Sequence, residues 1–338
     1  MLNFSPIFLL CSERSGSNLI VRILDSHPQL CGPPPSHLIR TLALNMTRFG
    51  EPQTSEADWQ TLLEISAGIM NNQLGIWREP WDKASLGRAA EERSVRGIIA
   101  AVYSSELRAH GKQRAFIKEN RIHLFLPFLV TAFPTAHYIW LVRDPRDMAL
   151  SWKLSSNHPG DVRKGANVWS HDQEGFRLIY GYLKASGRIH MLHYEVLLQE
   201  PEKKLTELCA FLGVPYTANM LAFHNNEATR KNADRISNWE NLAKPIMAGN
   251  FQKFLKALTA EEIGYIESLC ATEMIAHGYA LTATPPPLPE AKAAMAAKFG
   301  KQNLEAQLRD LGPEEQAIRK GRKAIIDQIN ALPIELPH

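Results

Sequence analysis

The fold is decided by one stretch near the start of the chain, Phe8-Leu9-Leu10-Cys11-Ser12-Glu13-Arg14-Ser15-Gly16-Ser17-Asn18, which is followed by the apolar-faced segment Leu19–Ser26. This pattern predicts a buried strand, a tight turn and then a helix. A turn of small residues that opens a helix presents several backbone N–H groups to one point. The positive end of the helix dipole lies at the same point, so the stretch is suited to binding a phosphate.

The side chains of the turn agree with anion binding. Gly16 allows close approach of the backbone to a ligand, while Ser15, Ser17 and Asn18 add hydrogen-bond donors and Arg14 adds a positive charge. No G-x-x-x-x-G-K-[ST] pattern occurs in the chain, so the turn is not an ordinary ATP or GTP loop. A plain strand–helix turn beside a solvated arginine is the alternative interpretation.

Four short apolar runs predict the strands of a parallel sheet, because parallel strands are covered on both faces and read as nearly continuous apolar segments. They are Ile7–Cys11, Ala115–Lys118, His137–Val142 and Arg188–Tyr194. Helical patterns separate these runs. We therefore expect an α/β fold with a parallel β-sheet flanked by helices.

Two helical additions to this sheet are expected. Residues 44–114 are mostly helical in pattern and predict an insert over the functional edge of the sheet. Residues 281–290 are rich in proline and predict a stiff linker between a domain over 1–280 and a helical extension over 291–338. The extension predicts two helices, Ala291–Leu311 and Pro313–Leu332. In the second, an apolar stripe consists of Ile318, Ile325, Ile329 and Leu332.

Composition excludes several classes of protein. The chain has 338 residues, of which 45% are hydrophobic and 22% charged, and its net charge is only +3. This balance does not fit a polybasic nucleic-acid binder. No apolar run approaches the about 18 residues that a membrane helix needs, and no signal peptide is apparent. The cysteines are far apart, so we expect neither a zinc site nor disulfides, and a cytoplasmic location fits best. They are Cys11, Cys31, Cys209 and Cys270.

A second candidate phosphate site follows another predicted strand. The run Arg143-Asp144-Pro145-Arg146-Asp147 places an arginine at the strand end and then a well-capped helix start. Ser151 and Ser155 are expected one turn apart on that helix. An arginine and a serine so placed can hold a phosphate by charge-assisted hydrogen bonds. A capped surface helix beside a structural arginine is the alternative.

These motifs resemble those of the sulfotransferases that use 3′-phosphoadenosine 5′-phosphosulfate (PAPS), and are most similar to the bacterial and tyrosylprotein types. Arg14–Asn18 resembles the family's 5′-phosphosulfate loop, and Arg143–Asp147 with Ser151 resembles its 3′-phosphate motif. His193-Tyr194-Glu195 looks like its Tyr-Glu block, and Lys244-Pro245 with Lys253-Phe254 resembles the loop that closes over the cofactor. The resemblance covers roughly residues 5–275 and implies the P-loop-like sulfotransferase fold.

The resemblance implies in-line transfer of a sulfuryl group by positioning and electrostatics, without a metal ion. PAPS is the implied donor, and its product is 3′,5′-adenosine bisphosphate (PAP). The insert 44–114 would then lie on the acceptor side. The resemblance implies that the phosphosulfate is bound by Arg14, Ser15, Gly16, Ser17 and Asn18. It implies that Arg143 and Ser151 bind the 3′-phosphate, with Ser155 as a weaker candidate. Tyr194 would contact the nucleotide, Lys253 would contact a phosphate, and Lys118 would neutralise charge on the transferred group.

The acceptor hydroxyl also needs a base. Tyrosylprotein-type relatives use a glutamate shortly after the first helix, but this chain has no carboxylate in Gly32–His37. Some bacterial relatives carry a histidine in a Pro-Pro-x-x-His context, which His37 matches, and a neutral imidazole is a competent base. A simple loop histidine is the alternative interpretation. His27 and His123 are weaker candidates.

Three functions stay open at this stage. The leading one is a sulfotransferase acting on a hydroxyl of a small molecule, peptide or carbohydrate. A catalytically weak module that binds PAP or PAPS is the second, and a P-loop-type small-molecule kinase is the third. The C-terminal helices are expected to be dispensable for cofactor binding and to pack on the core or on a second copy of the chain.

Overall fold

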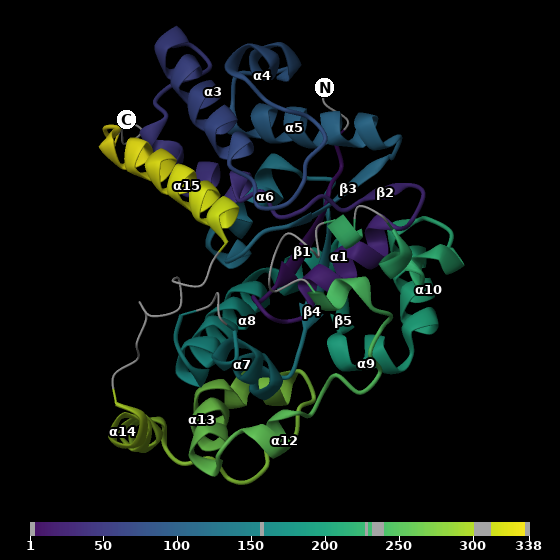
Figure 1. The fold of residues 1–338 in the computed structure, drawn as a ribbon, viewed down its shortest axis with the longest axis vertical. Coiled ribbons are helices and arrows are strands. Elements are labelled where there is room, and N and C mark those ends of the chain that lie inside the picture. Colours follow the sequence, from purple (N-terminus) through teal and green to yellow (C-terminus); the bar gives the residue numbers. More distant parts are fainter. Residues whose placement is uncertain (1–3, 156–158, 227–228, 232–239, 301–311, 335–338) are drawn as a thin grey trace.

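Five parallel strands form the central sheet of the computed structural model (Figure 1). Their order is β2 (Leu30–Cys31), β3 (Arg114–Lys118), β1 (Ile7–Cys11), β4 (His137–Val142) and β5 (Ile189–His193). The structure describes residues 4–155, 159–226, 229–231, 240–300 and 312–334. The parallel α/β fold is therefore confirmed, and β2, with only two residues, is the strand that the sequence pattern did not predict.

Both faces of the sheet are covered by helices, as its apolar strands require. Phe8 and Leu10 of β1 belong to one apolar core, and Ile7 and Leu9 belong to the other, because successive side chains of a strand point to opposite faces. The second core is closed by α1 (Ser17–Asp25), α9 (Tyr194–Gln199) and α10 (Pro201–Leu212). The first is closed mainly by α5 (Val95–His110), α6 (Leu126–Ala132), α7 (Pro145–Lys153), α8 (Val162–Ala185) and α13 (Ala260–Ala276).

The order of the strands determines which edge of the sheet carries the candidate site. The chain passes from β1 to β2 and β3 on one side of the sheet, and then to β4 and β5 on the other. In such open sheets a crevice forms at the carboxyl ends of the strands where the order reverses. The loops after β1, β3 and β4 therefore meet, and each begins with residues that the sequence analysis selected.

The predicted insert is helical. It contains α3 (Glu56–Asn71), α4 (Lys83–Ala89) and α5, and it is preceded by the short α2 (Leu38–Ala43). Trp59 and Trp81 are buried there, so these aromatic residues form part of a core rather than an exposed surface. The insert ends where β3 begins, at Arg114.

The C-terminal extension also contains helices, but these helices pack on different parts of the protein. The first, α14 (Leu288–Phe299), packs on α13, whereas α15 (Pro313–Ala331) packs on α3 of the insert, well away from α14 (Figure 1). The end of the predicted linker is already helical, since α14 begins at Leu288. Residues 301–311 of the predicted first helix lie outside the described residues.

The apolar stripe of α15 is covered within the chain. Ile329 is fully buried, and Ile325 and Leu332 pack against the first core. Helix α15 of the C-terminal extension thus packs on the helical insert of the same chain. Across the described ranges, no helix combines the length and hydropathy needed to span a bilayer.

Candidate active site

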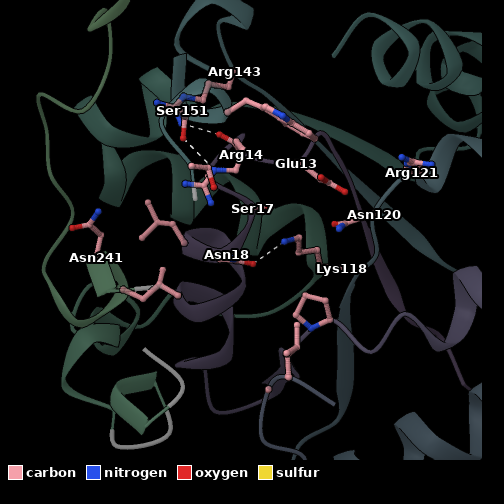
Figure 2. Close-up of a pocket in the computed structure, with 18 of the residues that line it drawn as sticks. Glu13, Arg14, Ser17, Asn18, Lys118, Asn120, Arg121, Arg143, Ser151 and Asn241 are labelled. Carbon is pink, nitrogen blue, oxygen red and sulfur yellow. Dashed lines mark hydrogen bonds between the residues drawn. The ribbon is translucent and has the colours of Figure 1, made fainter. Parts of the chain in front are cut away.

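A cavity of about 850 Å³ lies at the carboxyl ends of β1, β3 and β4. Most of the residues predicted for the site line it, although they come from segments far apart in the chain. The lining includes Arg14, Gly16, Ser17, Asn18, His37, Lys118, Arg143, Ser151, Tyr194 and Lys253. Figure 2 shows how many of these side chains converge.

The turn after β1 requires its glycine. Gly16 has φ of 87° and precedes α1 as its N-cap, and a Cβ on this residue would lie 2.2 Å from a ring carbon of Tyr194. The ring therefore packs directly against the turn. Ser17 and Asn18 begin α1, and their backbone N–H groups have no acceptor inside the helix.

Ser15 has a different place from the one expected. It is buried, its hydroxyl donates to the carbonyl oxygen of Ser12 at 2.7 Å, and it is absent from the cavity lining. This hydrogen bond closes the turn. The predicted side-chain donor toward a ligand is thus turned inward, and Ser15 shapes the loop rather than facing the cavity.

Arg14 joins the two predicted phosphate motifs. Its Nε donates to the hydroxyl of Ser151 at 3.2 Å, and its carbonyl oxygen accepts from Nη1 of Arg143 at 2.9 Å (Figure 2). The backbone of Arg14 is left-handed, with φ of 67°. Burial, together with the nearby Arg143, lowers the pKa of Arg14, so a bound anion would relieve charge repulsion between the two guanidinium groups.

Arg143 directly follows β4 and faces Tyr194. Its guanidinium carbon lies 4.5 Å from the centre of the tyrosine ring, and the tyrosine hydroxyl accepts from Nδ2 of Asn250 at 2.9 Å. Nε of Arg143 is buried without a hydrogen-bond partner in the described part of the chain. A buried unpaired donor is costly, so this atom indicates a position that a ligand acceptor would fill.

The helix after Arg143 begins as predicted but ends earlier. Asp144 caps it by accepting the N–H of Arg146, and Pro145 is its first residue. Because α7 ends at Lys153, Ser155 lies beyond it, and the prediction that Ser151 and Ser155 share one helical face is wrong. Ser155 still lines the cavity.

Asp147 has a role that the sequence analysis missed. Its carboxylate accepts the backbone N–H of Phe254 at 3.0 Å and that of Gln252. These two bonds flank Lys253 and hold its segment against the start of α7. The sequence offered only a helix-capping reason for an aspartate at this position, and a contact across 107 residues has no local signature.

Lys118 ends β3 and is 8% exposed. Its Nζ donates to the side-chain oxygen of Asn18 at 2.7 Å (Figure 2). Burial lowers the pKa of this lysine. The ammonium group is thus fixed beside the first turn of α1.

His37 also lines the cavity, next to a buried carboxylate. Its Nδ1 is 3.7 Å from Oε2 of Glu119, and neither atom has a hydrogen-bond partner among the described residues. The other oxygen of Glu119 accepts from the hydroxyl of Ser36 at 3.1 Å. His37 also has a left-handed backbone, with φ of 60°, which fixes the direction of its side chain at the start of α2.

The environment shifts both groups of this pair. Burial, reinforced by the charges of Arg40 and Arg322, lowers the pKa of His37 well below 6.5. Burial raises the pKa of Glu119 from 4.5 to about 7. The imidazole is therefore neutral near pH 7, as a proton acceptor must be.

The weaker histidine candidates lie elsewhere. His27 is fully buried and its Nε2 is 2.8 Å from the carbonyl oxygen of Pro215. His123 pairs with Asp172, with 2.6 Å between Nδ1 and the carboxylate. Neither residue lines the cavity, so both have structural places in the fold.

The last described helix reaches the cavity, which was not expected of an appendage. Arg319, Arg322, Ile325 and Ile326 of α15 all belong to the lining. They lie on the same side as His37, because Arg322 is bonded to Gln73, whose side chain in turn donates to the carbonyl oxygen of Ser36 at 2.9 Å.

Comparison with known proteins agrees with this arrangement. The model of a family described as "Sulfotransferase family" matches residues 6–218. A Caenorhabditis briggsae protein named as a candidate protein-tyrosine sulfotransferase is 26% identical over 64% of this chain and 69% of its own length. Nodulation protein NoeE of Sinorhizobium fredii is 28% identical over 45% of this chain, which spans about a third (32%) of NoeE.

Among solved structures, a sulfotransferase domain from the curacin biosynthetic pathway has a TM-score of 0.51 and 19% identity, with coverage of 83% of this chain and 100% of that domain. This likeness shows a shared fold. The family match shows more than a shared fold. It extends over well over half of the chain, and the matched residues include the loop after β1, Lys118, Arg143 and Tyr194. The chain therefore belongs to the sulfotransferase family.

Proposed function

We propose that this protein transfers a sulfuryl group from PAPS to a hydroxyl acceptor, with His37 as the general base. One observation carries the proposal: a single cavity is lined both by a cluster of groups suited to binding phosphate and by a neutral histidine beside a buried carboxylate. In-line transfer requires a donor site and a base in the same cavity, because the attacking and leaving oxygens lie on opposite sides of the transferred group.

The residues at the phosphate side fit a nucleotide with two phosphate positions. The N–H groups of Ser17 and Asn18 with Lys118 offer one anion position, and Arg143 with Ser151 offers the second. The unpaired Nε of Arg143 and the ring of Tyr194 packed on Gly16 support this fit. PAPS supplies the activated sulfuryl group when bound, and the chain contributes positive charge and position.

The residues at the other side fit proton removal. Since Nδ1 of His37 faces Glu119, Nε2 is the nitrogen left for the acceptor hydroxyl. Taking that proton makes the ring a cation, and the carboxylate of Glu119 stabilises it. Ser36 holds the carboxylate in place through its other oxygen.

Two measurements test the proposal directly. Calorimetric titration is expected to show binding of PAP in preference to ATP, which separates a sulfotransferase from a kinase. Transfer of label from radioactive PAPS to a panel of phenols, alcohols and sugars is expected to give a product. Binding of PAP without transfer to any hydroxyl compound would instead indicate a non-catalytic module.

Arg143→Ala is expected to weaken binding of PAP by about 10- to 100-fold and to change binding of AMP little, because AMP lacks the 3′-phosphate. The dissociation constants of both ligands are to be measured by titration. Arg143 also donates to the carbonyl oxygen of Arg14, so the variant tests for a structural effect as well. Equal losses for both ligands would mean that Arg143 only supports the loop.

Glu119→Gln is expected to lower kcat about 10- to 100-fold, since the negative charge 3.7 Å from Nδ1 of His37, which would stabilise the imidazolium, is lost. In the unaltered protein kcat falls as pH decreases through about 7, because Glu119 then takes up a proton and no longer stabilises the imidazolium. In the variant this fall moves below pH 6.5, where His37 itself is protonated. Profiles of kcat over pH 5–9 check the shift, and an unchanged profile would separate Glu119 from catalysis.

A further inference from the structure

The side of the cavity around His37 combines two kinds of surface. Ile69 and Leu74 from the insert face the same space as Ile325 and Ile326 from α15, so part of the wall is apolar. Arg40, Arg319 and Arg322 line the same region. Such a mixture binds molecules that have an apolar body and an anionic group.

The positive charge of this wall is only partly balanced. Arg319 forms an ion pair with Glu315 at 2.6 Å, but Arg322 donates to neutral groups, the carbonyl oxygen of Asn72 at 2.6 Å and the side-chain oxygen of Gln73 at 2.9 Å. Burial lowers the pKa of Arg322 to about 10, so it remains charged near pH 7. The backbone carbonyl oxygen of Arg40 accepts the N–H of Leu44, but its guanidinium group makes no hydrogen bond or ion pair within the described residues.

The carboxylate of Glu119 does not neutralise these arginines through direct hydrogen bonds. No hydrogen bond joins it to Arg40 or Arg322 in the described chain, and its bonded oxygen is held by Ser36. Its raised pKa shows that the surrounding positive charge does not offset the cost of its burial. Neither guanidinium group is therefore hydrogen-bonded to this carboxylate, although both are near enough to lower its pKa.

The position of α15 is set by close packing rather than by loose contact. A Cβ on Gly321 would lie 1.9 Å from the side-chain oxygen of Asn72, and one on Gly68 would lie 2.5 Å from Ile325. Arg48 donates to the carbonyl oxygen of Leu332 at 2.8 Å and so fixes the other end of the helix. The arginines of α15 are thus held at a defined place in the wall.

We propose that the acceptor is a hydroxylated molecule with an apolar body and a carboxylate or phosphate group, and that Arg40 of α2 and Arg322 of α15 bind this anionic group. The inference rests on the proposed function and specifies its acceptor. Guanidinium groups bind carboxylates and phosphates through paired hydrogen bonds, which explains why arginines occupy this wall. The apolar residues would contact the body of the same molecule.

Matched acceptor pairs test the proposal. 4-Hydroxyphenylacetate is to be compared with its methyl ester, 12-hydroxydodecanoate with its methyl ester, and 12-hydroxydodecyl phosphate with 1,12-dodecanediol, all with PAPS as donor. The free acids or the phosphate are expected to have a kcat/KM about 10- to 100-fold above that of their neutral partners, mainly through KM. The carboxylate and phosphate pairs show which anion is preferred.

Three variants identify the residues responsible. Arg40→Gln and Arg322→Gln are each expected to remove most of this preference and to leave the affinity for PAP unchanged. Arg322 also holds α15, so Arg40→Gln, which alters a residue of a different helix, keeps the test valid if the α15 variant is unstable. Lys323→Gln removes a charge from the exposed side of α15 and is expected to keep the preference.

A binding measurement separates this inference from the proposed function. Dodecanoate and dodecyl phosphate cannot accept a sulfuryl group at a hydroxyl, and they are to be titrated with and without PAP beside the neutral 1-dodecanol. Tighter binding of the anions, weakened by Arg40→Gln, would support the inference even if no turnover were found. Equal binding of anionic and neutral compounds, or a preference that both arginine variants retain, would overturn it.

Discussion

His37→Ala is expected to lower kcat by about 10²- to 10⁴-fold, the range that a general base contributes. The imidazole is neutral because burial holds its pKa well below 6.5, and its free nitrogen lines the cavity. Removing it leaves no other histidine on the cavity among the described residues. Steady-state transfer from labelled PAPS measures the loss, and titration with PAP is expected to show unchanged affinity, because His37 is proposed to contact the acceptor rather than the nucleotide.

His37→Gln should behave like the alanine variant, since it keeps a similar size without a comparable base. His171→Ala is a matched control because this histidine is exposed on α8 and absent from the cavity lining. Near-normal turnover of a true acceptor by His37→Ala would move the base to Glu119. His123, one of the weaker candidates in the sequence, pairs with Asp172 and does not line the cavity.

Lys118→Ala is expected to lower kcat by about 10²- to 10³-fold, as for the loss of one preorganised electrostatic donor. The ammonium group is held beside the first turn of α1 by Asn18, where the proposed function requires positive charge to stabilise the departing phosphate of the donor. Single-turnover transfer from labelled PAPS is the suitable measurement, because it reports the chemical step.

Lys118→Met provides a second variant that fills the buried space without a charge, and it should lose as much activity as the alanine. Lys320→Ala, on the exposed surface of α15, is the control for removal of a lysine. Turnover at the normal rate in both Lys118 variants would remove this residue from the site.

The fold was largely predictable because buried parallel strands leave continuous apolar runs. The runs that became β1, β3, β4 and β5 were found in the sequence to within a residue or so, whereas the two residues of β2 are too few for a pattern. The residues proposed to bind phosphate were predictable for a related reason. They directly follow strands whose carboxyl ends meet, so local motifs were enough to place them together.

The acceptor side was predictable only in part. His37 was found by its sequence context, but the neighbouring Glu119 pairs with it across 82 residues, and Ser15 is turned inward by a bond that no pattern encodes. The helix pattern of α15 indicated an apolar face but not the partner of that face. The packing of α15 on α3 depends on the close approach of Gly321 to Asn72. This contact forms between two surfaces, so neither segment of sequence reveals it alone.

The docking of α15 on α3 also sets an order of assembly during synthesis. Arg322 contacts Asn72 across 250 residues, whereas the loop after β1, Lys118 and Arg143 are all complete within the first half of the chain. Contacts of such long sequence separation form late, because their loop-closure cost is recovered only when both surfaces exist. On the ribosome, the loop after β1, Lys118 and Arg143 therefore emerge well before α15, and the part of the cavity wall that α15 forms is completed last.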